Sequence, residues 1–311
     1  MKTPVWLYYD KFHLPRMTDE LFAKICQDAP EFGFVKCATE EEFVAALPDA
    51  DMAATWKFRP EWTALAAKLK VIATPAAGRE MIKVEPRAGL ETMFGTFHGE
   101  LMAETVVGLI LAFARGIKLS FDWRGKNDWP RQEISSRMFA FRGSHAVIVG
   151  FGHIGKWIGR LLKPFGVRLT GVNRSDLVRP EYFGDGDNIV PISDMDAILP
   201  SADHLILALP GTTGTDKIID KRRLQLLSNK AFVYNVGRGN SIDAAALAEQ
   251  LQSGALAGAG LDVFEREPLA SDSPLRACDN VILLPHVSAM APNYLDLFFC
   301  EFIARIRNHN D

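Results

Sequence analysis

The chain has 311 residues, of which 48% are hydrophobic and 23% are charged, and its formal net charge is −3. That balance is typical of a globular protein long enough for two domains of ordinary size. No basic block and no basic–aromatic stripe occurs, so nothing indicates binding to nucleic acid or to an anionic membrane surface.

The cysteines indicate a reducing compartment. Four of them are scattered along the chain, with no C-x-x-C and no histidine-rich partner spacing, so we expect reduced thiols and neither a disulfide framework nor a metal site. The apolar part of MKTPVWLYYD is too short for a signal peptide. The longest apolar run, residues 105–114, is about half of what a bilayer requires. We therefore expect a cytoplasmic protein.

The first hundred residues alternate strand-like and helical segments. Apolar runs predict strands at 5–9, 34–37, 51–55 and 69–74, where the series closes, and helical spacing predicts helices at 18–28, 40–47 and 61–67. Thr18 is the expected N-cap of the first helix. Such alternation predicts a parallel sheet covered by helices. A long apolar helix over 99–118 follows, and then an irregular, tryptophan-bearing stretch over 121–141.

A second series of the same kind begins near residue 146. Its strands are predicted at 146–149, 167–175, 204–209, 231–236, 258–264 and 281–285, and a final helix at 293–308 is expected to pack on the first domain. The sequence thus predicts an α/β fold of two Rossmann-like, doubly wound parallel sheets. The outer, substrate domain is discontinuous (1–98 and 288–311), and the inner, dinucleotide-binding domain covers 99–287.

The strand–glycine–helix stretch AVIVGFGHIGKWIG carries the most specific chemistry. Gly150 suits the tight turn, Gly152 lets the backbone approach a pyrophosphate, and Gly155 lets the helix pack close to its strand. The free N–H groups and the dipole at the helix N-terminus favour phosphate. The spacing between two predicted strands indicates a dinucleotide site.

The end of the second strand indicates which dinucleotide binds. An NAD site has Asp or Glu there, but this chain has Asn173, Arg174 and Ser175. A guanidinium beside a hydroxyl suits a 2′-phosphate, so NADP(H) is favoured over NAD(H). The alternative is that Arg174 is a solvated loop arginine and NAD(H) still binds.

Three polar residues follow strands of the second series: Arg238, Glu267 and His286. The carboxyl ends of strands around a nucleotide crevice are where such folds place catalytic groups. A histidine can donate a proton near neutral pH, a carboxylate beside it raises its pKa, and an arginine offers two parallel donors to a carboxylate or carbonyl. Each residue alone could be structural or solvated, so their joint placement carries the hypothesis.

The chain resembles the D-isomer-specific 2-hydroxyacid dehydrogenases over nearly its full length. The resemblance rests on the glycine motif, ALPGTTGTDKIID, FVYNVGRGNSIDAAALAEQLQSGALAGAGLDVFEREPL and NVILLPHVSA. It implies that Arg238 binds the substrate carboxylate and carbonyl, that His286 is the general acid/base, and that Glu267 pairs with it. It also implies that the 121–141 stretch dimerises, which predicts a homodimer.

The resemblance extends to cofactor and substrate contacts. Asp262 would hold the nicotinamide amide, Thr105 would lie near the ring, and the remaining cofactor contacts would be Phe151, Gly152, His153, Ile154, Asn173, Arg174, Ser175, Leu209, Pro210, Thr215, Val236 and Gly237. The segment TPAAGREMI resembles the substrate loop, in which the backbone of Ala77, Gly78 and Arg79 would bind the carboxylate. Arg79-Glu80 stands where Asp or Asn commonly follows the glycine, which leaves the substrate side chain open. Trp56 could line the substrate pocket or simply pack.

These features together predict an NADPH-dependent reductase of small 2-oxo acids such as glyoxylate or hydroxypyruvate, with no metal. One alternative is a non-catalytic dinucleotide sensor. Another is an enzyme of the same fold that oxidises another small anion, as a phosphite dehydrogenase does.

Overall fold

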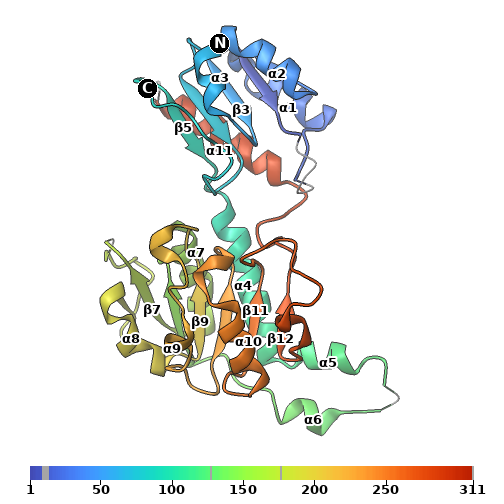
Figure 1. The fold of residues 1–311 in the computed structure, drawn as a ribbon, viewed down its shortest axis with the longest axis vertical. Coiled ribbons are helices and arrows are strands. Elements are labelled where there is room, and N and C mark those ends of the chain that lie inside the picture. The colour runs from blue at the N-terminus through green and yellow to red at the C-terminus, as the bar shows by residue number, and fades with distance from the viewer. Residues whose placement is uncertain (9–13, 127, 176, 310–311) are drawn as a thin grey trace. The chain divides into compact units, whose positions relative to one another are not determined.

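The structure is a computed structural model that describes residues 1–8, 14–126, 128–175 and 177–309. The chain forms two compact units: unit 1 comprises Met1–His98 and Ala291–Asp311, and unit 2 comprises Gly99–Met290. Each unit has its own parallel sheet with helices (Figure 1), so the predicted fold class is confirmed. No helix in the described ranges combines the length and apolar character that crossing a bilayer requires.

Unit 1 contains a five-stranded sheet in the order β2-β1-β3-β4-β5, with every pair parallel. The α1 helix begins as predicted, because the Thr18 hydroxyl accepts a hydrogen bond from the Leu21 amide at 3.1 Å. The elements are β1 (Thr3–Trp6), α1 (Asp19–Asp28), β2 (Phe34–Lys36), α2 (Glu40–Ala46), β3 (Met52–Thr55), α3 (Pro60–Leu65), β4 (Val71–Thr74) and β5 (Glu91–Phe94).

Two predictions for unit 1 were wrong in detail. The strand series does not close at residue 74, because β5 adds an edge strand. The β5 sequence ETMF has one fully buried residue, and an edge strand needs no continuous apolar run. The strand predicted at 5–9 begins at Thr3 and ends at Trp6, and position 9 lies outside the described residues.

The α11 helix (Tyr294–His309) completes the core of unit 1, as the sequence predicted. Its Phe299 ring contacts Phe34 edge-on at 5.8 Å, and its Phe302 ring contacts Phe32 at the same distance. Helix α11 therefore packs on aromatic residues that lie 265 (Phe299 to Phe34) and 270 (Phe302 to Phe32) positions earlier in the chain.

Unit 2 contains a seven-stranded parallel sheet in the order β12-β11-β10-β9-β6-β7-β8. The residues of β6, β9, β10 and β11 are all buried, which explains their continuous apolar sequences. The strands are β6 (His145–Val149), β7 (Arg168–Asn173), β8 (Asn188–Pro191), β9 (His204–Leu207), β10 (Phe232–Asn235), β11 (Gly258–Leu261) and β12 (Val281–Leu283).

The helices of unit 2 also correct the sequence reading. The helix predicted at 99–118 ends at Ala114, because Gly116 adopts a left-handed backbone (φ 65°). The following stretch is not wholly irregular, since it contains two short helices. Strand β8 was not predicted, because only two of its four residues are buried. The helices are α4 (His98–Ala114), α5 (Ile117–Trp123), α6 (Arg131–Ser135), α7 (His153–Leu162), α8 (Met195–Ile198), α9 (Lys221–Leu224) and α10 (Ala244–Gln252).

Candidate active site

The strand order of unit 2 reverses between β6 and β9, and the glycine-rich turn lies at that point. Gly150 follows β6 with φ 92°, and a Cβ there would lie 2.6 Å from the Ala208 carbonyl oxygen after β9. A Cβ on Gly155 would lie 2.5 Å from the Gly150 oxygen. Both glycines are therefore required by close packing, as the dinucleotide motif predicts.

Gly152 differs from its two neighbours, because a Cβ there would meet no protein atom within 4 Å. It is the N-cap of α7, it is exposed, and it provides no side-chain cap for the amides of the first turn. An exposed, uncapped helix N-terminus with room for a ligand fits a pyrophosphate. The residues present thus fit the dinucleotide that the motif implies.

At the end of β7, the side chain of Asn173 links two segments of this site. Its amide nitrogen donates to the Phe151 carbonyl at 3.3 Å, and its oxygen accepts from the Arg174 amide at 2.9 Å. The side chains of Arg174 and Ser175 are exposed. Asn173 therefore positions the turn, and the two residues after it are accessible to a ligand.

Several other predicted cofactor residues have structural duties. The Phe151 ring is buried where a Cβ on Gly171 would lie, 2.5 Å away, and the side chains of Leu209 and Val236 are buried as well. The Thr215 hydroxyl donates to the Pro210 carbonyl at 2.6 Å. Gly237 packs against Leu209. At the start of α7, His153 is exposed and Ile154 is half-buried.

The predicted catalytic residues follow β10, β11 and β12, which are adjacent in the sheet. His286 Nδ1 lies 2.8 Å from a carboxylate oxygen of Glu267. Because an ionised carboxylate can only accept, Nδ1 donates, and Nε2 is left for a reacting molecule. The other Glu267 oxygen accepts from the Phe264 amide at 3.0 Å. Half of the His286 side chain is exposed.

The electrostatics of this pair match the task of a general acid. The hydrogen bond to Glu267 and its charge raise the pKa of His286 against the opposing effects of burial and Arg238. Burial alone would raise the pKa of Glu267, but the bonds from His286 and Phe264 and the charge of Arg238 hold it lower than usual. Both groups are thus stabilised in their charged forms, and Arg238 is close enough to act on both.

Asp262 has a role that the sequence did not show. Its buried carboxylate accepts from the Val287 amide at 2.7 Å and the Ser288 amide at 2.9 Å, and its carbonyl accepts from the His286 amide at 2.9 Å. His286 itself has a left-handed backbone, φ 58°. Successive amides around a left-handed residue form an anion-binding nest, so Asp262 fixes the backbone of the histidine. The Thr105 hydroxyl adds a bond to the Ser288 carbonyl at 3.0 Å.

Asn235 is a second residue that sequence reasoning missed. It is fully buried at the end of β10, and its side chain donates to the Arg238 carbonyl at 3.1 Å and accepts from the Gly237 amide at 3.1 Å. It therefore holds the turn that carries Arg238, a role for which the available signal was a polar residue ending an apolar strand.

The predicted substrate residues belong to unit 1. Ala77 and Arg79 are exposed and Gly78 is half-buried in the loop after β4. Trp56 follows β3 and is 2% exposed; it donates to the Pro15 carbonyl at 3.2 Å and stacks on Tyr294. Within unit 1, Trp56 is therefore a packing residue.

Matched substitutions of two glycines distinguish a glycine that leaves room for the ligand from one that is required for packing. Gly152→Ala should fold normally but weaken dinucleotide binding by about tenfold, because the new methyl group occupies the open space at the α7 N-terminus. Gly150→Ala should lower the unfolding temperature, because its Cβ would meet the Ala208 oxygen. Dye-monitored unfolding and dinucleotide titration test both; equal affinity in Gly152→Ala and the unchanged protein would contradict the assignment.

Removing the Glu267 charge should lower the pKa of His286. In Glu267→Gln the imidazolium loses the carboxylate that stabilises it, while burial and Arg238 still oppose its charge. An NMR titration of the imidazole Cε1 proton measures this pKa directly. Glu265→Gln, an exposed carboxylate two residues earlier, serves as the control, and an equal pKa in both variants would refute the coupling.

Comparisons with known proteins show which family the chain belongs to. A family model described as "D-isomer specific 2-hydroxyacid dehydrogenase, NAD binding domain" matches residues 107–288. The chain is 30% identical over 282 residues to the D-3-phosphoglycerate dehydrogenase of Methanocaldococcus jannaschii, covering 88% of this chain and 53% of that enzyme. It is 33% identical over 233 residues to the glyoxylate reductase of Pyrococcus furiosus, covering 72% and 68%.

A solved structure shows the same similarity over the whole chain. The D-isomer specific 2-hydroxyacid dehydrogenase family protein of Aeromonas salmonicida has a TM-score of 0.78 at 26% identity, covering 99% of this chain and 96% of that one. The chain spans about half the length of the M. jannaschii enzyme that it matches. With the family model matching more than half of its residues, the chain belongs to the D-isomer specific 2-hydroxyacid dehydrogenases, a family of NAD(P)-dependent oxidoreductases.

Proposed function

We propose that this protein reduces a small 2-oxo acid to the D-2-hydroxy acid with NADPH, and that glyoxylate- or hydroxypyruvate-type acids are its substrates. The observation that carries the proposal is the 2.8 Å contact between His286 and Glu267, with the pKa of the imidazole raised. A histidine held in its charged form is a competent acid near neutral pH.

The roles of the side chains follow from their charges. Arg238 binds the substrate carboxylate and polarises the 2-carbonyl oxygen. When bound, a reduced nicotinamide supplies a hydride to the 2-carbonyl carbon. His286 gives its Nε2 proton to the carbonyl oxygen, so the C=O group becomes an alcohol and the ring becomes neutral. Glu267 stays ionised and keeps the ring oriented through Nδ1.

The same proposal assigns the other predicted residues. The backbone amides of Ala77, Gly78 and Arg79 bind the substrate carboxylate. The Gly150–Gly155 turn would hold the dinucleotide, Thr105 would lie near its nicotinamide ring, and Asp262 would hold the nicotinamide amide. The four cysteines are free thiols, which supports a cytoplasmic location.

Turnover tests the reaction. Loss of NADPH absorbance should be seen with glyoxylate, hydroxypyruvate or pyruvate, and His286→Ala should lower kcat by roughly a thousandfold because the proton donor is lost. Dinucleotide affinity should persist in that variant, which serves as the control for folding. Absence of turnover despite dinucleotide binding would overturn the proposal and favour a sensor.

The choice of dinucleotide is a separate part of the proposal. Arg174 and Ser175 are exposed beside the glycine turn, and no carboxylate stands among residues 173–175. A guanidinium and a hydroxyl there would bind a 2′-phosphate, and residues 173–175 offer no carboxylate to accept hydrogen bonds from the ribose hydroxyls.

Arg174→Asp should weaken NADPH binding by about tenfold or more while changing NADH binding by less than about threefold. Fluorescence titration with each dinucleotide measures both constants. Arg179→Asp is the matched control, since Arg179 is engaged with the Gly184 carbonyl and the Phe183 ring. Equal loss for both dinucleotides in Arg174→Asp would contradict NADPH preference.

We also assign a homodimer, formed through the segment that includes α5 and α6. Phe121 is 60% and Trp129 86% exposed there. Large apolar side chains that are this exposed indicate a protein–protein contact. Sedimentation should give twice the chain mass, and Phe121→Asp with Trp129→Asp should halve it. Leu65→Asp, an exposed apolar residue of α3, should leave the mass unchanged; a monomeric unchanged protein would refute the dimer.

A further inference from the structure

The side chain of Arg79 carries a charge that nothing in the described part of the chain neutralises. Its guanidinium carbon lies 5.1 Å from the centre of the Phe94 ring, and the residue is exposed. Among the described residues, its guanidinium makes this aromatic contact and no ion pair. Arg79 is therefore a cation resting on a neutral ring.

Two other arginines of unit 1 have polar partners. Arg59 also lies over an aromatic ring, 5.2 Å from the centre of Trp62, but it pairs with Glu40 at 2.7 Å. The guanidinium of Arg87 donates to main-chain carbonyls, among them that of Ala66 at 2.7 Å. The contrast with Arg59 shows that stacking on a ring does not by itself leave an arginine unpaired.

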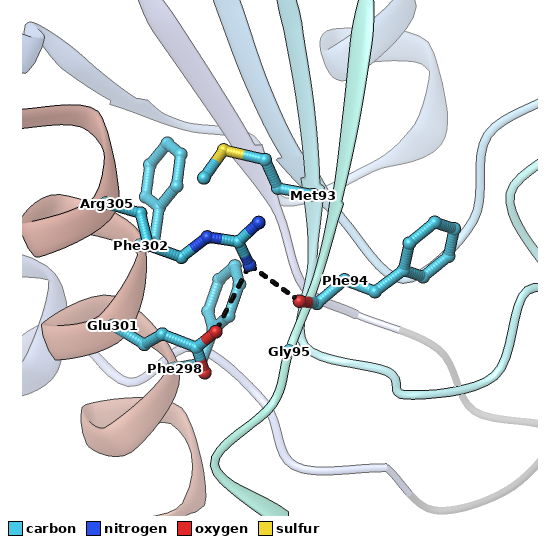
Figure 2. A pocket seen from close by; sticks show the side chains of 7 residues that line it. All are labelled: Met93, Phe94, Gly95, Phe298, Glu301, Phe302 and Arg305. Carbon is cyan, nitrogen blue, oxygen red and sulfur yellow. Dashed lines mark hydrogen bonds and ion pairs between the residues drawn. The ribbon is translucent and has the colours of Figure 1, made fainter. Parts of the chain in front are cut away.

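The backbone of Phe94, whose ring lies beneath Arg79, is held by α11. Arg305 donates to the Phe94 carbonyl at 3.0 Å and pairs with Glu301 at 3.2 Å, while Glu301 accepts from the Thr96 and Phe97 amides. Figure 2 shows the Phe94 side chain pointing away from Arg305. The end of β5 is thus fixed from one side, and its ring is presented on the other, where Arg79 lies.

We propose that Arg79 makes this enzyme prefer 2-oxo acids that carry a second carboxylate over monocarboxylic acids such as glyoxylate, which still react. The inference rests on the proposed function, in which the backbone of residues 77–79 binds the first carboxylate. A cation–π contact at an exposed site is weak, whereas a guanidinium binds a carboxylate through two parallel charge-assisted hydrogen bonds. Moving the Arg79 guanidinium from the Phe94 ring to a substrate carboxylate therefore stabilises the enzyme–substrate complex.

The position of Arg79 decides which carboxylate it binds. In the proposed function its own amide belongs to the backbone group of residues 77–79 that takes the first carboxylate, so its side chain is left for another group of the same molecule. A monocarboxylic acid has nothing to offer that guanidinium. Until such an acid binds, the Phe94 ring keeps the long side chain in place, which reduces the entropy lost on binding.

A pair of acids of equal chain length tests the inference. The ratio of kcat/KM for 2-oxoglutarate to that for 2-oxopentanoate is measured in the unchanged protein, in Arg79→Met and in Arg59→Met. The unchanged protein should favour the dicarboxylate; Arg79→Met should reduce the ratio about tenfold or more, and Arg59→Met should hold it within about twofold. Arg79→Gln is the second variant if Arg79→Met does not fold, as judged by thermal unfolding.

The outcomes separate this inference from the function on which it rests. A ratio that stays the same in Arg79→Met while both acids still react would overturn the role of Arg79 alone. Equal losses for both acids would also overturn it, because Arg79 would then bind the shared carboxylate. No turnover of either acid or of any other 2-oxo acid would overturn the proposed function, and the selectivity with it.

Discussion

The carboxylate of Asp262 lies wholly inside unit 2 and receives the amides of Val287 and Ser288, while its own carbonyl receives the amide of His286. Burying a carboxylate is unfavourable unless its oxygens are hydrogen-bonded, and here both are. A left-handed histidine is also unfavourable by itself. The left-handed backbone at His286 supplies the amides that the buried Asp262 carboxylate needs. In return, the hydrogen bonds to Asp262 stabilise that unfavourable backbone conformation. The contact between His286 and Glu267 depends on this arrangement.

Close approach of neighbouring loops is the second constraint on the site. A Cβ on Gly237 would lie 2.5 Å from the Leu209 amide, and one on Gly239 would lie 1.9 Å from the Phe264 carbonyl carbon. These glycines flank Arg238, so the turns after β9, β10 and β11 pack with no side chains between them. The carboxyl ends of adjacent parallel strands are about 5 Å apart, and small residues let the turns keep that spacing.

Much of the fold was predictable because buried parallel strands read as unbroken apolar runs. The strands around β6 and β10 are of that kind, whereas β5 and β8 are partly exposed edge strands whose pairing is set by their neighbours. Residue type and position after a strand predicted that Glu267 and His286 lie close together, and the structure has them in contact. The positioning duty of Asp262 was not predictable, because its partners come 25 and 26 residues later in the chain. Whether Trp56 was buried likewise depended on Tyr294, contributed by the last helix.

The two crossings between the units bear on the order in which the protein can form. Unit 2 is one continuous segment, Gly99–Met290, so every strand of its sheet is present once that segment has been synthesised. Unit 1 is not continuous, because Phe32 and Phe34 find their aromatic partners only on α11. During synthesis on the ribosome, the strands of unit 1 are therefore made first, but part of their aromatic core stays exposed until α11 is made. The sheet of unit 2 is made later and can fold before unit 1 is complete.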